Sequence, residues 1–145
     1  MDQYLIEVKD KVTDSGRHMA PHNLFEALLR RIVPYKEIGW QDIGEVFYRY
    51  TFIKSRWFNL YLHVLDAPSW HPVGCHDHPW WFITLLLSGG YLEYNGKKLS
   101  HRYPGMVLYR PAKHAHDVTT PYGTSWSSVL TGPKERTWGF KSCEA

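Results

Sequence analysis

The chain has 145 residues, the size of a single domain with one core, and its formal net charge is only +3. It contains no long basic run, so the charge pattern gives no sign of a nucleic-acid-binding face. The apolar run from Ile83 to Leu87, interrupted by Thr84, is far shorter than the roughly 20 residues that span a bilayer. The first residues also lack the apolar segment of a signal peptide. We therefore expect a soluble cytoplasmic protein that binds neither nucleic acid nor membranes.

Two cysteines, Cys75 and Cys143, lie far apart in the sequence, which argues against a scaffold built on disulfides. We expect Cys75 to serve as a small buried apolar residue. Aromatic residues are abundant, with 7 Trp, 10 Tyr and 6 Phe, and such residues favour strands.

The first element predicted along the chain is a helix over residues 24–32. Asn23 is suited to cap it, Glu26 follows three residues later as in a capping box, and Pro34 ends it. Apolar residues at positions 24, 25, 28, 29 and 32 follow the spacing of one helix face. We expect this face to cover the outer side of a sheet.

From residue 44 onward the pattern changes to short strands separated by glycine and proline. Asn95 and Gly96 predict a tight hairpin turn between two of them. Strands at this spacing without intervening helices predict an all-β sandwich or barrel, closed as a jelly roll. We therefore divide the chain into a helical or loop-like extension, residues 1–43, and a β-barrel, residues 44–145. The predicted strands are Glu45–Lys54, Trp57–Asp66, Trp80–Ser88, Gly90–Tyr94, Met106–Tyr109, His114–Thr119, Ser125–Leu130 and Thr137–Phe140.

Histidines gather at two places in the predicted barrel. His71, His76 and His78 fall within eight residues, and His114 and His116 flank a single alanine. Residues two apart on a strand point to the same face, so each His-x-His pair directs two imidazoles together. Two such pairs on neighbouring strands can meet at one ion, and neutral imidazole suits Fe, Zn, Ni and Cu. His71 is expected on a loop that approaches this site.

Two segments resemble the motifs of the cupin superfamily. Gly74–His78, followed by Gly89, resembles the first cupin motif, and Gly105–His116, with Pro111 inside it, resembles the second. A narrower similarity links the chain to a small, poorly characterised cupin group from bacteria and phages. It rests on Phe58–His63, His76–Trp80, Leu130–Lys134 and Trp138–Phe140.

The resemblance implies a cupin-type double-stranded β-helix, that is, a jelly-roll barrel, with an N-terminal helical segment. It also implies that His76, His78 and His116 are metal ligands. The chain departs from the motifs at the cupin glutamate, where Phe82 and Ile83 stand, and at a glycine replaced by Lys113. The remaining three-histidine set resembles that of the thiol dioxygenases, which are cupins that use Fe(II). Fe(II) is therefore the favoured ion, with Zn, Ni or Mn as alternatives.

Further residues are expected around this site, each with an alternative role. By strand parity His114 shares a face with His116, and is either a fourth ligand or a residue of the pocket or its rim. Asp77 alternates away from the histidines and is expected to hydrogen-bond a loop. Trp80, Phe82 and Trp126 are expected to form apolar walls.

Three residues are candidates for catalysis. Tyr61 and His63 share one face of a predicted strand and meet substrate if that face lines the barrel; otherwise they pack beneath an aromatic lid. Arg110 lies next to the metal-binding loop and is either an anchor for an anionic substrate or a surface arginine.

Three functions fit these residues. The first is an Fe(II)-dependent, dioxygenase-like enzyme that acts on a small organic substrate, by analogy with the three-histidine cupins. The second is a non-catalytic module that binds a metal and a ligand, as a sensor or an assembly component, and four protein ligands would favour it. The third is a sugar isomerase or epimerase that uses histidine as acid and base. A homodimer is left open.

Overall fold

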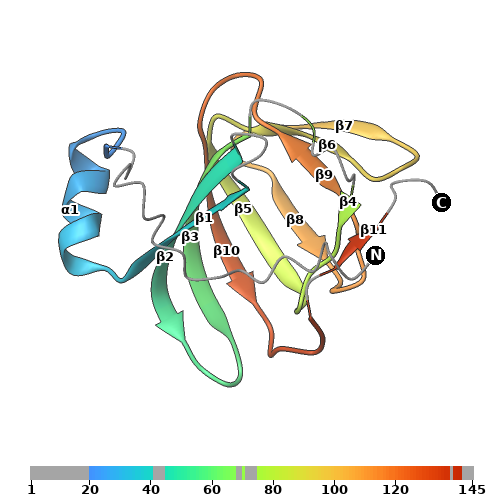
Figure 1. The fold of residues 1–145 in the computed structure, drawn as a ribbon, viewed down its shortest axis with the longest axis horizontal. Coiled ribbons are helices and arrows are strands. Elements are labelled where there is room, and N and C mark those ends of the chain that lie inside the picture. The colour runs from blue at the N-terminus through green and yellow to red at the C-terminus, as the bar shows by residue number, and fades with distance from the viewer. Residues whose placement is uncertain (1–19, 41–44, 68–69, 71–74, 138, 142–145) are drawn as a thin grey trace.

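The computed structural model describes residues 20–40, 45–67, 70, 75–137 and 139–141. Figure 1 shows one helix beside a curved β-structure. The elements in chain order are α1 (Leu24–Ile32), β1 (Tyr35–Trp40), β2 (Glu45–Lys54), β3 (Asn59–Asp66), β4 (Cys75–His76), β5 (Phe82–Ser88), β6 (Tyr91–Tyr94), β7 (Leu99–Arg102), β8 (Val107–Arg110), β9 (Asp117–Thr119), β10 (Ser125–Thr131) and β11 (Phe140–Lys141). Within the described residues no helix is long and apolar enough to cross a membrane.

The strands form three antiparallel sheets. The largest has the order β1-β2-β3-β10-β5-β8, and the smaller ones have the orders β7-β6-β9 and β11-β4. In Figure 1 the two smaller sheets lie on the side of the molecule opposite α1. Strands adjacent in this order are distant in sequence, as β3 and β10 are, which is typical of a jelly roll. The expected all-β architecture is confirmed.

Alternation along the central strands divides the large sheet into two faces. On one face of β2 and β3, Tyr48, Tyr50, Leu62 and Val64 form a core cluster with Leu29 of α1. The opposite face lines a cavity. There Arg49 pairs in register with His63, and His63 with Ser127 of β10. The helix thus covers the outer side of the sheet, and the cavity lies on the inner side.

The helix buries a different set of residues from the one predicted. Leu29 is buried, but Leu24 and Ile32 are 78% and 77% exposed, and Phe25 and Leu28 are also exposed. Glu26 is fully buried instead, because His22 and Arg30 neutralise its carboxylate there. The predicted cap is confirmed, since Asn23 Oδ1 accepts a hydrogen bond from the Glu26 backbone N–H at 2.9 Å.

Two local differences concern the strands. The segment 1–43 was expected to hold only helix and loop, yet Tyr35–Trp40 forms β1, which pairs antiparallel with β2. The predicted hairpin is present between β6 and β7, but its turn is displaced by one residue. The Asn95 N–H donates to the Lys98 carbonyl, and Gly96 inside that turn has φ of 93°, a conformation that favours glycine.

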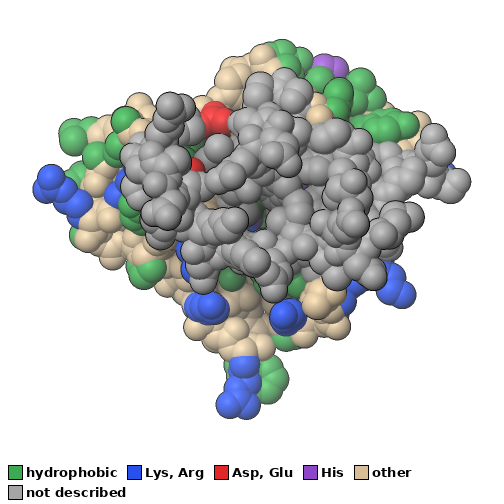
Figure 2. Space-filling model, viewed as in Figure 1, with side chains coloured by type: hydrophobic (Ala, Val, Ile, Leu, Met, Phe, Trp, Pro, Cys, Tyr) green, Lys and Arg blue, Asp and Glu red, His purple; other side chains and the backbone are tan. Residues whose placement is uncertain are grey.

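On the face shown in Figure 2, the described Lys and Arg side chains lie apart from one another around the margin. They form no single basic patch in that view.

Candidate metal centre and cavity

Three histidines predicted as metal ligands come together where β4 meets the segment just before β9. His76 on β4 and His116, just before β9, form a β-bridge in which each backbone N–H donates to the other's carbonyl, at 2.9 and 3.0 Å. The three ring centroids of His76, His78 and His116 are 4.9–5.0 Å apart, with interplanar angles of 64–80°. One side-chain nitrogen from each ring lies within 4.8 Å of the other two. The rings therefore surround a common point rather than stacking.

The loop that carries His78 is held from both sides. The His78 backbone N–H donates to the Ala112 carbonyl at 3.0 Å, and the Asp77 N–H donates to the Gly139 carbonyl at 2.9 Å. The buried Asp77 carboxylate forms an ion pair with Arg136, whose Nη2 lies 3.0 Å from Asp77 Oδ2. Asp77 thus contacts the loop after β10, as its alternation with the histidines predicts.

Burial favours the neutral, metal-binding form of the His78 and His116 imidazoles. It holds the pKa of His78 well below the ordinary value, and the charges of His116 and His76 act in the same direction. Burial also lowers the pKa of His116, although the Glu93 carboxylate opposes this shift. Neutral imidazole is the form that binds metals, so the donor set fits a divalent transition metal.

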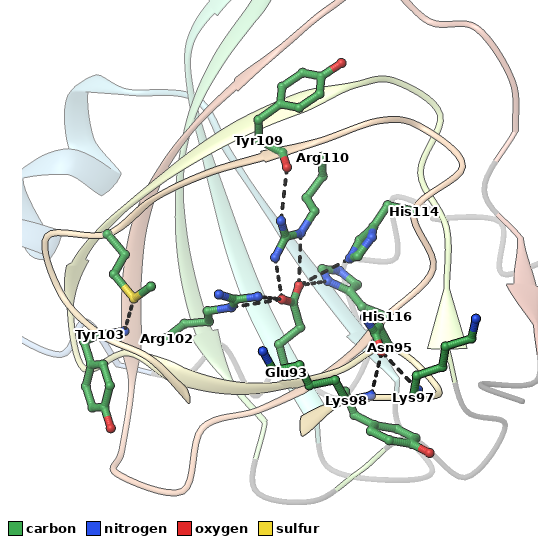
Figure 3. A network of polar contacts seen from close by, with 12 residues as sticks. Glu93, Asn95, Lys97, Lys98, Arg102, Tyr103, Tyr109, Arg110, His114 and His116 are labelled. Carbon is green, nitrogen blue, oxygen red and sulfur yellow. Dashed lines mark hydrogen bonds and ion pairs between the residues drawn. The ribbon is translucent and has the colours of Figure 1, made fainter. Parts of the chain in front are cut away.

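The sequence analysis missed Glu93, which controls the orientation of His116. The Nδ1 atom of His116 lies 2.6 Å from Glu93 Oε2, so it donates its proton there and leaves Nε2 as the lone-pair nitrogen. Figure 3 shows the Glu93 carboxylate also receiving the guanidinium groups of Arg102 and Arg110, whose Nη2 atoms lie 2.9 and 2.6 Å from Oε1. The sequence did contain a signal for Glu93. It lies two residues from Tyr91 on the same strand, so both side chains share one face of β6, and both are buried.

The Glu93 carboxylate is held as an anion. Burial alone would raise the pKa of Glu93, but the adjoining His114, His116 and Arg110 side chains outweigh it and place the pKa far below the ordinary value. Glu93, His114 and His116 also offer ligand atoms within 4.8 Å of one another. Because two guanidinium groups already bind the Glu93 carboxylate, the three-histidine set is the better metal site.

His114 occupies a different environment from the one that strand parity predicted. It lies in a loop, because β9 begins only at Asp117, and its backbone N–H closes a turn on the Pro111 carbonyl at 3.0 Å. Its Nε2 atom lies 3.5 Å from Glu93 Oε2. Figure 3 shows this ring beside that of His116, with both rings next to the Glu93 carboxylate.

A cavity of about 120 Å³ adjoins the three histidines. Its lining is mostly aromatic and aliphatic, with a few polar groups. The lining residues are Phe47, Arg49, His63, Leu65, His76, His78, Trp80, Phe82, Thr84, Tyr91, His116, Val118, Ser125, Ser127 and Val129.

Of the expected walls, Trp80 and Phe82 line the cavity, and the Phe82 ring lies 4.4 Å from that of His78. Trp126 does not. Ser125 and Ser127 face the cavity, so alternation along β10 turns Trp126 to the outer side, where it contacts His22 and Phe25 of the helical segment.

The three candidate catalytic residues lie in different places. His63 lines the cavity, and Tyr61 stacks beside it with ring centroids 5.8 Å apart. Burial, reinforced by the charge of Arg49, holds the pKa of His63 well below its ordinary value. Arg110 is absent from the described lining and binds Glu93 instead. His71 lies outside the described residues.

Cys75 is fully buried, as expected, but it is disulfide-bonded rather than a free thiol. Its partner lies outside the described residues. The pairing of β11 with β4 brings Lys141 opposite Cys75, so the end of the chain returns to this strand. Distance along the sequence could not reveal that return.

No family model and no curated protein sequence matches this chain. Solved structures match its fold. A cupin-2 domain protein, Rru_A2000 from Rhodospirillum rubrum, has a TM-score of 0.62 at 10% identity, covering 76% of each chain. The DMSP lyase DddQ from Ruegeria pomeroyi DSS-3 has a TM-score of 0.61 at 19% identity, covering 79% of this chain. The EutQ protein of Clostridium difficile has a TM-score of 0.57 at 10% identity, covering 69% of this chain and 78% of EutQ.

This chain spans 64% of the length of the DMSP lyase, less than two thirds. At these identities the likeness concerns the fold alone. It agrees with the observed sheet order. The chain therefore has the fold of these solved structures, a double-stranded β-helix.

Proposed function

We propose that this chain is a metal-dependent cupin enzyme that holds one divalent ion on His76, His78 and His116. The observation that carries the proposal is a set of three converging imidazoles that lines a small, mostly apolar cavity. A structural ion is usually enclosed by four protein ligands, whereas three leave positions for a substrate. The cavity is the place where that substrate binds.

Fe(II) is the ion we favour, and Zn, Ni or Mn also suit imidazole donors. Three neutral ligands leave the charge of a divalent ion uncompensated by the protein. When bound, such an ion supplies Lewis acidity and, if it is iron, a redox centre for O₂. We therefore propose dioxygenase-like oxidation of a small organic substrate as the leading reaction.

The residues of the chain itself have definable roles in this proposal. Glu93 fixes the tautomer of His116, and Trp80 and Phe82 exclude water from the cavity. His63 accepts a hydrogen bond from Arg49 Nε on its Nε2 atom at 3.1 Å, so its proton resides on Nδ1. His63 and the adjacent Tyr61 are the candidate proton carriers.

The test is O₂ consumption by protein prepared without air and loaded with Fe(II). A panel of small thiols and related organic acids is supplied, and O₂ uptake is followed together with substrate loss. We expect stoichiometric uptake with at least one compound, and none with the His116→Ala variant. Full iron loading without turnover on any compound would contradict the catalytic proposal and favour a non-catalytic binding module.

A lyase is the second candidate, because two of the solved structures with this fold are described as DMSP lyases and cover 79% and 76% of this chain. Substrate loss that needs the metal but consumes no O₂ would favour it. Activity that survives removal of the metal by a chelator would instead point to the acid–base isomerase or epimerase. The homodimer and the cytoplasmic location stay predictions.

A further inference from the structure

The cavity contains a buried cation that has no carboxylate partner among the described residues. Arg49 on β2 is only 9% exposed and lines the cavity. Its guanidinium lies over the rings of Tyr61, Trp80 and Phe47, at 4.5, 5.5 and 5.7 Å from their centroids. Its Nε–H donates to His63 Nε2. No ion pair to Arg49 occurs in the described part of the chain.

Four other arginines of the described chain are paired with carboxylates. Arg102 and Arg110 bind Glu93, and Arg136 binds Asp77. Arg30 binds Glu26. Burying a guanidinium without an anion is costly, and cation–π contacts offset only part of that cost. Burial lowers the pKa of Arg49 to about 10, so the side chain remains protonated at neutral pH.

The geometry of Arg49 leaves its terminal nitrogens for a ligand. Nε is used by His63, while the two Nη groups have no hydrogen-bond partner among the described residues. A guanidinium presents such N–H groups as a planar fork that matches a carboxylate. The aromatic rings around Arg49 restrict its movement, so the fork is held in place before a ligand arrives.

A second polar group faces the same cavity. Ser125 is 2% exposed and lines the cavity, and its buried Oγ has no hydrogen-bond partner among the described residues. Arg49, His63 and Ser127 form one row across β2, β3 and β10, and Ser125 lies two residues along β10 from Ser127. The polar groups of an otherwise apolar cavity determine which ligand it accepts.

The size of the cavity limits the ligand. An apolar cavity of roughly 150 Å³ accommodates benzene, so about 120 Å³ suits a molecule of five or six non-hydrogen atoms. One unpaired guanidinium neutralises one negative charge. The aromatic walls disfavour a more highly charged anion such as phosphate.

We propose that the cavity binds a small monocarboxylate, with the carboxylate on the Nη groups of Arg49 and the rest of the molecule directed toward the three histidines. A small monocarboxylate is thus the substrate class of the proposed function. The part of the proposal that directs the ligand toward the three histidines rests on that function. Binding of the carboxylate requires only Arg49 and the cavity. Carboxylate binding and metal binding are therefore tested separately.

The test uses propionate as the probe and propionamide as its neutral isostere, at constant ionic strength. Binding is measured by calorimetry and thermal shift, first on chelator-treated protein and then on protein loaded with Mn(II) as a redox-stable ion. We expect propionate to bind both forms and propionamide to bind neither. We expect Arg49→Met to weaken propionate binding about tenfold or more, as loss of a charge-assisted hydrogen-bonded pair does.

Two further variants and a control keep this test decisive. Arg49→Lys keeps the charge without the fork and should bind propionate with intermediate affinity. Ser125→Ala should weaken binding by a smaller factor. Arg56→Met, at an exposed arginine, removes the same charge outside the cavity and should bind propionate as the unmodified protein does. Circular dichroism checks that each variant is folded.

Unchanged propionate binding in Arg49→Met would overturn the inference. So would equal binding of propionamide or inorganic phosphate, or no propionate binding to either form of the protein. Metal content of Arg49→Met is measured in parallel and should equal that of the unmodified protein. Absence of metal from both, with propionate still bound through Arg49, would overturn the proposed metal-dependent function and leave the carboxylate site standing.

Discussion

At the scale of single residues, Glu93 determines how His116 can act. Its carboxylate takes the Nδ1 proton of His116 and is in turn held by Arg102 and Arg110. Carboxylates behind metal-binding histidines fix the tautomer and raise the basicity of the ligating nitrogen. The buried network thus prepares one of the three imidazoles for a metal.

Replacing Glu93 with Gln should weaken metal binding by about 10- to 100-fold, because the amide is a poorer acceptor and leaves two guanidinium groups without an anion. Metal affinity is measured by competition with a chelator at neutral pH, at a temperature where the variant is folded. Glu135→Gln, at an exposed glutamate, is the matched control and should leave the affinity unchanged. Equal affinities of the two variants would show that Glu93 does not support the metal site.

The sequence predicted the histidines but not Glu93 or Arg49, and the reason is physical. Two His-x-His pairs are a local signal, since residues two apart share a face of an extended strand. Glu93 acts on His116 only because β6 pairs with β9, a contact that no local pattern encodes. Both faces of β2 are buried, with Tyr48 and Tyr50 opposite Arg49, so hydrophobic alternation could not show which way Arg49 points.

At the scale of elements, helix α1 shows where pattern reading succeeds and fails. The cap and the length were predicted, because they depend on neighbouring residues. The buried face was wrong, because Glu26 carries partners that allow it to be buried while Leu24 remains exposed. A prediction from periodicity uses only the positions of apolar residues. It cannot include the pairing of the Glu26 carboxylate with His22 and Arg30.

Leu29→Ala should therefore lower the free energy of unfolding by about 2–5 kcal/mol, as truncation of a buried leucine does. Leu24→Ala, on the same helix, should change it by less than about 0.5 kcal/mol, because Leu24 is 78% exposed. Urea denaturation of both variants measures the difference. Equal losses would mean that the helix packs on the sheet through the predicted apolar face.

The longer strands were predicted, whereas the short strands β4 and β7 and the pairing of the strands were not. The predicted Glu45–Lys54 agrees with β2 at both ends. Trp126 was expected in a cavity wall, but only the register of β10 against β3 and β5 shows that its neighbours Ser125 and Ser127 take that side. Strand β1 was missed in a segment expected to be helical or loop-like.

At the scale of the whole molecule, the closing of the barrel creates the site. His76 and His78 are far from His116 in the sequence, and the bridge between His76 and His116 brings them together. The inner face of the large sheet then supplies the rest of the cavity. The sequence reached this arrangement only through the resemblance to cupin motifs, because the physics of a single strand does not specify which strands become neighbours.

The most direct test of the account is the metal content of the protein after purification without an affinity metal column and loading with a single divalent ion. Elemental analysis should give about one ion per chain, and the His76→Ala, His78→Ala and His116→Ala variants should each lose most of it while remaining folded. The exposed His101, replaced by Ala, is the control and should retain the full amount. Retention of the ion by the three variants, or failure of the unmodified protein to bind any divalent ion, would contradict the account.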